Sequence, residues 1–260
     1  MGRFATTASL YEHLRPPYPP EFFRSVAETL KLSTRHALID LGTGPGLLAL
    51  GFAPYVGRIV GVDPELAMIA AARAAAARSG QDFTLIEGKA EDLPGDIGRF
   101  DIVTIGRALH WMERGATLKL LERLLAEDGA LLICASSSAA DGRNAWLKSY
   151  NAARKTWADA GLEPSTGKGA RIHRELAAFL DGSPFRVKST IEVETSHAMS
   201  ISDLAQRVLT YSSSSPAVLG DKANAMLADV EARLAPFSCD GRVTDVVIST
   251  AQVVRRYLGR

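Results

Sequence analysis

Apolar segments of strand length alternate with helical patterns over the first half of the chain, and this order constrains the fold most. The segments are residues 36–41, 58–62, 82–87, 100–105 and 130–135. Strands separated by helices pair in parallel through crossover connections. Buried parallel strands are apolar on both faces, as the runs beginning at Ala37 and Ile102 are. The order therefore predicts an α/β fold with a doubly wound, mostly parallel sheet.

Two crossover helices carry their own start and stop signals. Asp63, followed by Pro64 at a first helical position, predicts a helix over residues 65–78, and Ser79-Gly80 ends it. This segment is rich in alanine, which has the highest helix propensity. Residues 115–126 place leucines on one face and predict a further helix.

The pattern changes after Cys134, where a loop rich in serine and alanine predicts a boundary near residue 137. Beyond it we expect longer segments with more helix. Helices are expected over residues 144–160, 171–180, 201–210 and 218–234, and strands over 185–194 and 243–254.

Composition excludes several classes of protein. With 260 residues, 47% of them hydrophobic, the chain can bury a large core and is not disordered. The formal net charge of +1 predicts no general attraction to nucleic acid or to an anionic membrane. No segment approaches the roughly 20 apolar residues of a membrane helix. Cys134 and Cys239 are far apart and match no disulfide scaffold, so we expect a cytoplasmic protein.

A glycine-rich turn follows the first strand, in the segment from Leu38 to Gly46. Glycines at positions 42, 44 and 46 let the backbone turn sharply and approach a ligand closely, which indicates a nucleotide-like ligand. The G-x-G-x-G spacing departs from the G-x-G-x-x-G of dinucleotide sites. Asp40 would repel a pyrophosphate and favours a ligand with a cationic group such as a sulfonium. A second interpretation, in which Asp40 only braces the loop by hydrogen bonds, stays open.

Asp63 closes the second strand about 20 residues downstream of the glycines. At this position an acidic side chain can accept hydrogen bonds from both ribose hydroxyls. It can also serve as a helix N-cap before Pro64, and the two roles are compatible.

On these residues the chain resembles the class I S-adenosylmethionine-dependent methyltransferases, of the small-molecule subgroup that includes ubiquinone-biosynthesis and trans-aconitate methyltransferases. The resemblance covers residues 11–135. It implies a seven-stranded, Rossmann-like sheet with a helical lid inserted in the C-terminal half. Residues 1–136 would then hold an N-terminal segment and the cofactor-binding core. Residues 137–260 would hold the lid and the last strands of the same globular unit.

The resemblance also implies roles in a cofactor site. The glycine loop would wrap the methionine part, Asp63 would bind the ribose and Met68 would pack on the adenine. Many relatives have Asp where this chain has Lys89, so the adenine amino contact would move to Glu91 and the Ala90 backbone. The full predicted cofactor set is Tyr11, Arg15, Asp40, Gly42, Thr43, Gly44, Gly46, Asp63, Pro64, Met68, Ala90, Glu91 and Arg107.

The fourth strand ends in a His-Trp pair that resembles the same family. His110 is the predicted catalytic residue, a general base toward a hydroxyl or amine, because its ordinary pKa lies near neutrality. In the alternative, His110 bonds backbone and shapes the pocket while Trp111 fills the core. Arg107 either lines the cofactor pocket through its backbone or is a solvated loop residue.

Two interpretations also apply to the N-terminal segment, which is rich in proline and aromatic residues. Arg15 either pairs with the methionine carboxylate or an acidic substrate, with Tyr11 contributing a hydroxyl, or the segment only packs against the sheet. Substrate candidates in the second half are Trp146, Tyr150, Trp157, His173, His197 and Tyr211, although the first three also fit a packing stripe.

Other site classes lack their motifs. The five histidines are scattered and match no metal site, and neither a Gly-x-Ser-x-Gly elbow nor a phosphate loop is present. We therefore expect an enzyme that transfers a methyl group from S-adenosylmethionine to an O, N or C nucleophile of a small organic molecule. Alternatives are a non-catalytic S-adenosylmethionine-binding protein and, less favoured, an NAD(P)-dependent oxidoreductase. The residues do not indicate an oligomeric state.

Overall fold

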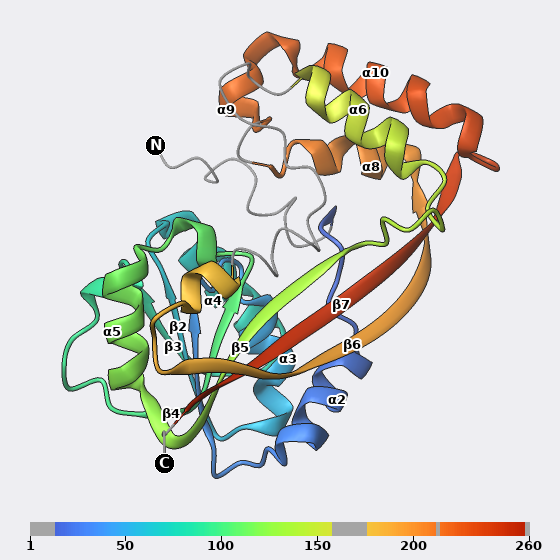
Figure 1. Cartoon of the computed structure of the whole chain (residues 1–260). Coiled ribbons are helices and arrows are strands. Elements are labelled where there is room, and N and C mark those ends of the chain that lie inside the picture. The colour runs from blue at the N-terminus through green and yellow to red at the C-terminus, as the bar shows by residue number, and fades with distance from the viewer. Residues whose placement is uncertain (1–13, 158–175, 212–213, 258–260) are drawn as a thin grey trace. The chain divides into compact units, whose positions relative to one another are not determined.

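A computed structural model of the chain describes residues 14–157, 176–211 and 214–257 (Figure 1). In these ranges seven strands form one sheet in the order β3-β2-β1-β4-β5-β7-β6. This confirms the predicted seven-stranded α/β fold. The strands are β1 (Ala37–Leu41), β2 (Arg58–Asp63), β3 (Thr84–Glu87), β4 (Phe100–Gly106), β5 (Leu125–Ser138), β6 (Phe185–Ser200) and β7 (Arg242–Arg256).

The five N-terminal strands pair in parallel. Ile39 of β1 lies opposite Val60 of β2 and Val103 of β4, and β3 and β5 extend the sheet on either side. Parallel pairing brings the carboxyl ends of these strands to one edge of the sheet, which is where open α/β sheets bind their ligands. The chain segments that leave this edge are the glycine loop after β1, Pro64 after β2 and Arg107 after β4.

Helices cover both faces of this part of the sheet (Figure 1). Leu38 belongs to a buried apolar cluster with Phe22 of α2 and Phe52 of α3, whereas its neighbour Ile39 belongs to a cluster with Leu121 of α5. This alternation follows from the two-residue period of a strand. The helices around these five strands are α2 (Pro20–Leu30), α3 (Leu47–Phe52), α4 (Leu66–Arg78) and α5 (Arg114–Leu124).

The start of α4 differs from the expected one. The helix begins at Leu66, its N-cap is Glu65 in an extended conformation, and Pro64 precedes the helix instead of opening it. The reason is a hydrogen bond from the Glu65 amide to the Asp63 carboxylate at 2.9 Å, which holds residues 63–65 in a turn. The end is as expected, because Ser79 is the C-cap and Gly80 has a left-handed φ of 63°.

The later helices are shorter or more broken than their patterns predict. The segment expected from residue 144 becomes helical only at Leu147, because the Asn144 side chain bonds the backbone of Ala139 and Val246. The segment expected over 218–234 divides at Gly220, which has a φ of 53°. Of the segment expected over 171–180, only residues 176–180 are described, and they are helical. The helices are α6 (Leu147–Trp157), α8 (Ile201–Val208), α9 (Pro216–Leu219) and α10 (Ala223–Leu234).

Short 3₁₀ turns connect several elements. They are η1 (Ala53–Tyr55), η2 (Ala90–Asp92), η3 (Leu109–Trp111), η4 (Gly220–Lys222) and η5 (Ala235–Phe237).

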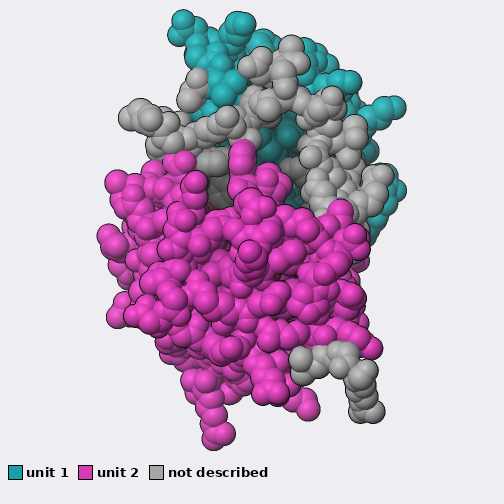
Figure 2. Space-filling view, turned by 60° about the vertical axis from the view of Figure 1, so that its left-hand side comes forward, with its two compact units in different colours: residues 1–17, 136–168, 194–248 teal, residues 18–135, 169–193, 249–260 magenta. Residues whose placement is uncertain are grey.

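The chain divides into two compact units, shown in different colours in Figure 2. Unit 1 contains residues 1–17, 136–168 and 194–248, and unit 2 contains residues 18–135, 169–193 and 249–260. Unit 2 holds the glycine loop, Asp63 and α2 to α5, whereas unit 1 holds α6, α8, α9 and α10. The assignment of residues 1–136 to a cofactor core and 137–260 to a lid stays a prediction.

Neither a membrane-crossing helix nor a group of three metal-binding side chains occurs among the described residues.

Candidate cofactor site

The loop between β1 and α3 folds back over the end of β2. The amides of Gly42 and Thr43 both donate to the carbonyl of Val62, at 2.8 and 2.9 Å. Gly42, Gly44 and Gly46 have φ values of 71°, 55° and 85°, in the left-handed region that favours glycine. These glycines therefore permit the turn that the sequence motif predicts.

The glycines differ in what surrounds them. A Cβ at Gly42 would lie 2.4 Å from the Cβ of Ala108, so this glycine is required for packing. A Cβ at Gly44 would have no atom of the described residues within 4 Å. The backbone of Gly44 is thus accessible to a ligand.

Asp40 is buried at the carboxyl end of β1. Its Oδ2 accepts a hydrogen bond from the Thr43 hydroxyl at 2.7 Å, and its Oδ1 accepts one from the Thr104 hydroxyl at 2.6 Å. Burial raises the pKa of Asp40 from 3.8 to about 6, against the lowering effect of these bonds. Asp40 therefore makes the bracing contacts of the second interpretation, and its contact with a ligand stays a prediction.

Thr104 was not identified as a site residue by sequence reasoning. It is fully buried in β4 and connects that strand to Asp40 of β1. The available signal is a single polar residue inside the apolar run Ile102-Val-Thr-Ile, since a buried hydroxyl needs a partner.

Asp63 joins the glycine loop to the start of α4. Its Oδ2 accepts from the Gly44 amide at 2.8 Å, and its Oδ1 accepts from the Glu65 amide at 2.9 Å. Burial raises the pKa of Asp63, and the two amide bonds oppose that effect. The N-cap role proposed for Asp63 is wrong, because Glu65 holds that position. Each carboxylate oxygen retains a second lone pair, so a ribose contact is chemically compatible with both bonds.

The residues predicted around the adenine have different exposures. Met68 is buried in the first turn of α4, Pro64 is exposed and Ala90 is buried in η2. The Oε1 of Glu91 accepts from the Glu113 amide at 3.0 Å and from the Thr117 hydroxyl at 3.2 Å. Glu91 thus already contacts the N-terminal end of α5, which the sequence did not indicate.

The segment after β4 carries Arg107, His110 and Trp111. Arg107 has a φ of 59°, and its guanidinium carbon lies 5.1 Å from the Tyr18 ring centroid. His110 is exposed in η3, with its ring 4.9 Å from that of Trp111. The interpretation that Trp111 fills the core is wrong, because 56% of it is exposed. The neighbouring Met112 packs against the apolar cluster instead.

Arg15 lies in unit 1, where its Nη2 donates to the carbonyl of Thr210 at 2.8 Å. Its predicted contact with the methionine carboxylate or an acidic substrate stays a prediction. Tyr11 lies outside the described residues.

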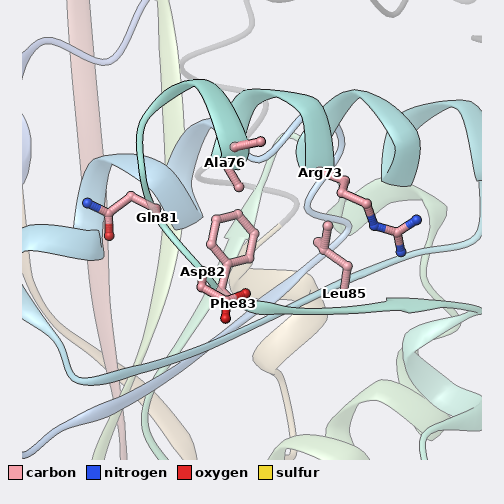
Figure 3. A pocket seen from close by; sticks show the side chains of 7 residues that line it. Arg73, Ala76, Gln81, Asp82, Phe83 and Leu85 are labelled. Atoms are coloured by element: carbon pink, nitrogen blue, oxygen red, sulfur yellow. The ribbon is translucent and has the colours of Figure 1, made fainter.

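A separate groove of about 280 Å³ lies between α4 and the start of β3 (Figure 3). Phe83 forms its floor toward Ala76, and the polar side chains around it are exposed. None of the predicted cofactor residues lines this groove, which is formed by Arg73, Ala76, Ala77, Gln81, Asp82, Phe83 and Leu85.

Comparison with known proteins shows a match to the methyltransferase domain family over residues 38–129. The uncharacterised methyltransferase YcgJ of Bacillus subtilis is 30% identical over 132 residues, which are 50% of this chain and 52% of YcgJ. The protein named "Probable S-adenosylmethionine-dependent methyltransferase CRG1", of Saccharomyces cerevisiae, is 28% identical over 125 residues, 46% of this chain and 42% of CRG1. The chain thus spans about half the length of these curated relatives.

The fold has solved counterparts. A methyltransferase from Geobacter sulfurreducens, solved in complex with S-adenosyl-L-homocysteine, superposes with a TM-score of 0.59 at 18% identity. The superposition covers 98% of this chain and 97% of that protein. At this level of identity the likeness shows a shared fold.

Proposed function

The chain carries a class I S-adenosylmethionine-dependent methyltransferase domain, and on this premise we propose that the protein transfers a methyl group from S-adenosylmethionine to a small organic acceptor. The observation that carries the proposal is the hydrogen bond from the Gly44 amide to the Asp63 carboxylate, at a glycine whose Cβ position no described atom crowds. The Asp63 carboxylate, which can accept hydrogen bonds from ribose hydroxyls, is thus held next to the Gly44 backbone, which a ligand can approach.

In the proposed complex the loop from Asp40 to Gly46, including Thr43, borders the methionine part of the cofactor. Asp63 accepts the ribose hydroxyls, and Met68 packs against the adenine. The remaining contacts come from Tyr11, Arg15, Pro64, Ala90, Glu91 and Arg107.

The loop suits a cofactor without phosphate. Asp40 has a pKa of about 6 and is therefore mostly ionised at neutral pH. Its negative charge beside the loop disfavours a pyrophosphate, which dinucleotide sites place on the helix N-terminus. The sulfonium of S-adenosylmethionine is positively charged, so the Asp40 carboxylate attracts it.

S-adenosylmethionine supplies an already activated methyl group, so the protein has to align the acceptor and exclude water. In the transfer the bond between sulfur and the methyl carbon breaks as the bond between the acceptor and that carbon forms. We assign His110 the acceptance of a proton from a hydroxyl or amine acceptor. The exposure of the His110 ring in η3 supports this role, because a general base must reach its substrate.

The acceptor is proposed to be small, with an O, N or C nucleophile, and the enzyme is proposed to act in the cytoplasm. The net charge of +1 supports a small acceptor over a nucleic acid or an anionic membrane, because binding to either of these generally requires an excess of basic residues.

Isothermal titration calorimetry with S-adenosyl-L-homocysteine and, separately, with NAD tests the proposal. We expect saturable binding of S-adenosyl-L-homocysteine that weakens at least about tenfold in Asp63→Ala, roughly 1.4 kcal/mol of binding free energy. Asp82→Ala is the matched control, since Asp82 is exposed and lies outside the predicted site, and it should bind as the wild type does. A thermal melt of each variant verifies that it is folded.

Two results would change the assignment. Binding of NAD alone would contradict the methyltransferase function and indicate an oxidoreductase. Binding of S-adenosyl-L-homocysteine without turnover over a broad panel of acceptors would indicate a non-catalytic cofactor-binding protein.

A further inference from the structure

Arginine side chains gather around Tyr211 in unit 1. The guanidinium carbon of Arg154, on α6, lies 3.6 Å from the Tyr211 ring centroid, and that of Arg15 lies 3.9 Å from it. Arg207 of α8 is a third cation of this cluster, and it interacts electrostatically with Tyr150 of α6. All five residues belong to unit 1.

Arg207 has an evident structural role. It is 2% exposed, and it donates to the carbonyl of Leu14 at 2.6 Å and to Oδ2 of Asp245 at 3.0 Å. Its third partner is the Ser138 hydroxyl at 3.3 Å. The Asp245 carboxylate is therefore already paired with Arg207.

Arg154 has fewer contacts than Arg207. It is half-buried, and its Nη1 donates to the Asn151 side chain at 3.3 Å. Its Nε is buried and has no hydrogen-bond acceptor among the described residues. Nearby Asp229 receives hydrogen bonds from Arg233 and Trp157 instead. The Arg154 guanidinium thus has in-plane N–H donors, Nε among them, that the described residues leave unused.

Tyr150 shows the same property. The side chain is 2% exposed, its ring packs 5.7 Å from that of Trp146, and its buried hydroxyl has no hydrogen-bond partner in the part of the chain that the structure describes. The guanidinium carbon of Arg154 lies 5.9 Å from the Tyr150 ring centroid. Since a buried hydroxyl without a hydrogen bond is costly, its retention beside an under-used guanidinium indicates a missing acceptor.

We propose that Arg154 and the Tyr150 hydroxyl bind an anionic group of the methyl acceptor, a carboxylate or a phosphate, beside the ring of Tyr211. This inference rests on the proposed function and adds the chemical class of the acceptor. A guanidinium binds such groups through paired N–H donors, and the tyrosine hydroxyl supplies a further donor. Tyr150 thereby has a role beyond the packing stripe to which its spacing also belongs.

The two tryptophans among the sequence candidates differ from Tyr150. The indole of Trp146 donates to the carbonyl of Thr244 at 2.8 Å, and that of Trp157 donates to Asp229 at 2.7 Å. Both indoles thus have protein partners, as packing residues do.

Calorimetric titration of the full chain with malonate, succinate and inorganic phosphate, at constant ionic strength in chloride, tests the site. The variants are Arg154→Gln, Tyr150→Phe and Lys155→Gln. Lys155 is the matched control, because it is the exposed cation next to Arg154 on α6. We expect saturable binding of at least one anion, weaker by about tenfold in Arg154→Gln and about threefold in Tyr150→Phe, and unchanged in Lys155→Gln. The anion that binds best distinguishes a carboxylate from a phosphate group.

Thermal unfolding separates this role from a structural one. Tyr150→Phe should not lower Tm, because the hydroxyl has no partner to lose. The proposal is overturned if no anion binds saturably, if Lys155→Gln weakens binding as much as Arg154→Gln, or if Tyr150→Phe lowers Tm while leaving anion affinity unchanged. A parallel titration with S-adenosyl-L-homocysteine distinguishes failure of this proposal from failure of the proposed function. If S-adenosyl-L-homocysteine does not bind, the methyltransferase function is contradicted, whereas the anion titrations still test the site at Arg154 and Tyr150.

Discussion

Asp40 illustrates at the scale of one residue what the sequence predicts and what it leaves open. Its place before the first glycine marks it as a loop residue, and the structure adds two threonine hydroxyls as partners. Thr104 stands 64 positions later in the chain and reaches Asp40 only because β4 pairs with β1. No local pattern contains that pairing.

The raised pKa of Asp40 leads to a pH-dependent stability. A rise from 3.8 to about 6 means that folding favours the protonated acid. The contribution is complete below pH 3.8 and is lost as the pH rises through about 6. Asp40→Asn removes the titration and retains a polar side chain. Urea unfolding should show the free energy of unfolding of the wild type falling, relative to Asp40→Asn, by about 2 kcal/mol between about pH 4 and about pH 7.

The direction of this difference is diagnostic. A constant difference between the two proteins over the pH range, or one that grows in favour of the wild type toward neutrality, would contradict the raised pKa of Asp40.

At the scale of elements, the glycine loop was predicted as a ligand-binding turn and has the left-handed conformations that such a turn needs. The start of α4 was not predicted correctly, because a Pro at a first helical position is only a statistical signal. The hydrogen bond from Glu65 to Asp63 delays the helix to Leu66. Side-chain contacts of this kind override local propensity, and they depend on the neighbouring strand end.

Gly44→Ala and Gly80→Ala form a matched pair that separates ligand contact from backbone strain. Both glycines have a left-handed φ, 55° and 63°, and a Cβ at either would meet no atom of the described segments within 4 Å. Each substitution should therefore cost a similar free energy of unfolding, on the order of 1 kcal/mol, because alanine is strained in this conformation. Only Gly44→Ala should also weaken the binding of S-adenosyl-L-homocysteine, by about tenfold or more, because the alanine methyl group enters the space proposed for the cofactor.

Urea melts and calorimetry on both variants check this pair. Equal cofactor affinities for Gly44→Ala and Gly80→Ala would show that the cofactor does not approach Gly44.

At the scale of the whole molecule, unit 1 is assembled from three separate chain segments. Arg207 links all three, since its partners Leu14 and Ser138 come from the other two segments and Asp245 comes from its own. The sequence does not predict the ion pair between Arg207 and Asp245, because an arginine in an amphipathic helix is normally solvated. Both charges are buried, with Arg207 2% and Asp245 0% exposed.

Arg207→Leu should destabilise unit 1 by about 3 kcal/mol or more, because it removes the 3.0 Å partner of the buried Asp245 charge and leaves it facing His197 at 4.0 Å. Arg143→Leu is the matched control, since Arg143 pairs with Asp141 and Glu194 at the surface, where ion pairs contribute little. Hydrogen exchange followed by mass spectrometry should show faster exchange in unit 1 for Arg207→Leu and little change for Arg143→Leu. An increase spread evenly over both units would contradict the assignment of this pair to unit 1 alone.

The sequence by itself determined the fold class, the strand segments of the first half and the positions of the glycine loop and Asp63. These features depend on local periodicity and on backbone conformations that few residues other than glycine adopt. The tertiary structure alone decided that Thr104 holds Asp40, that Glu91 contacts α5, and that Arg154 lies over the ring of Tyr211. Such contacts join residues that are distant in sequence, and they form only when strand pairing and helix packing bring their side chains together.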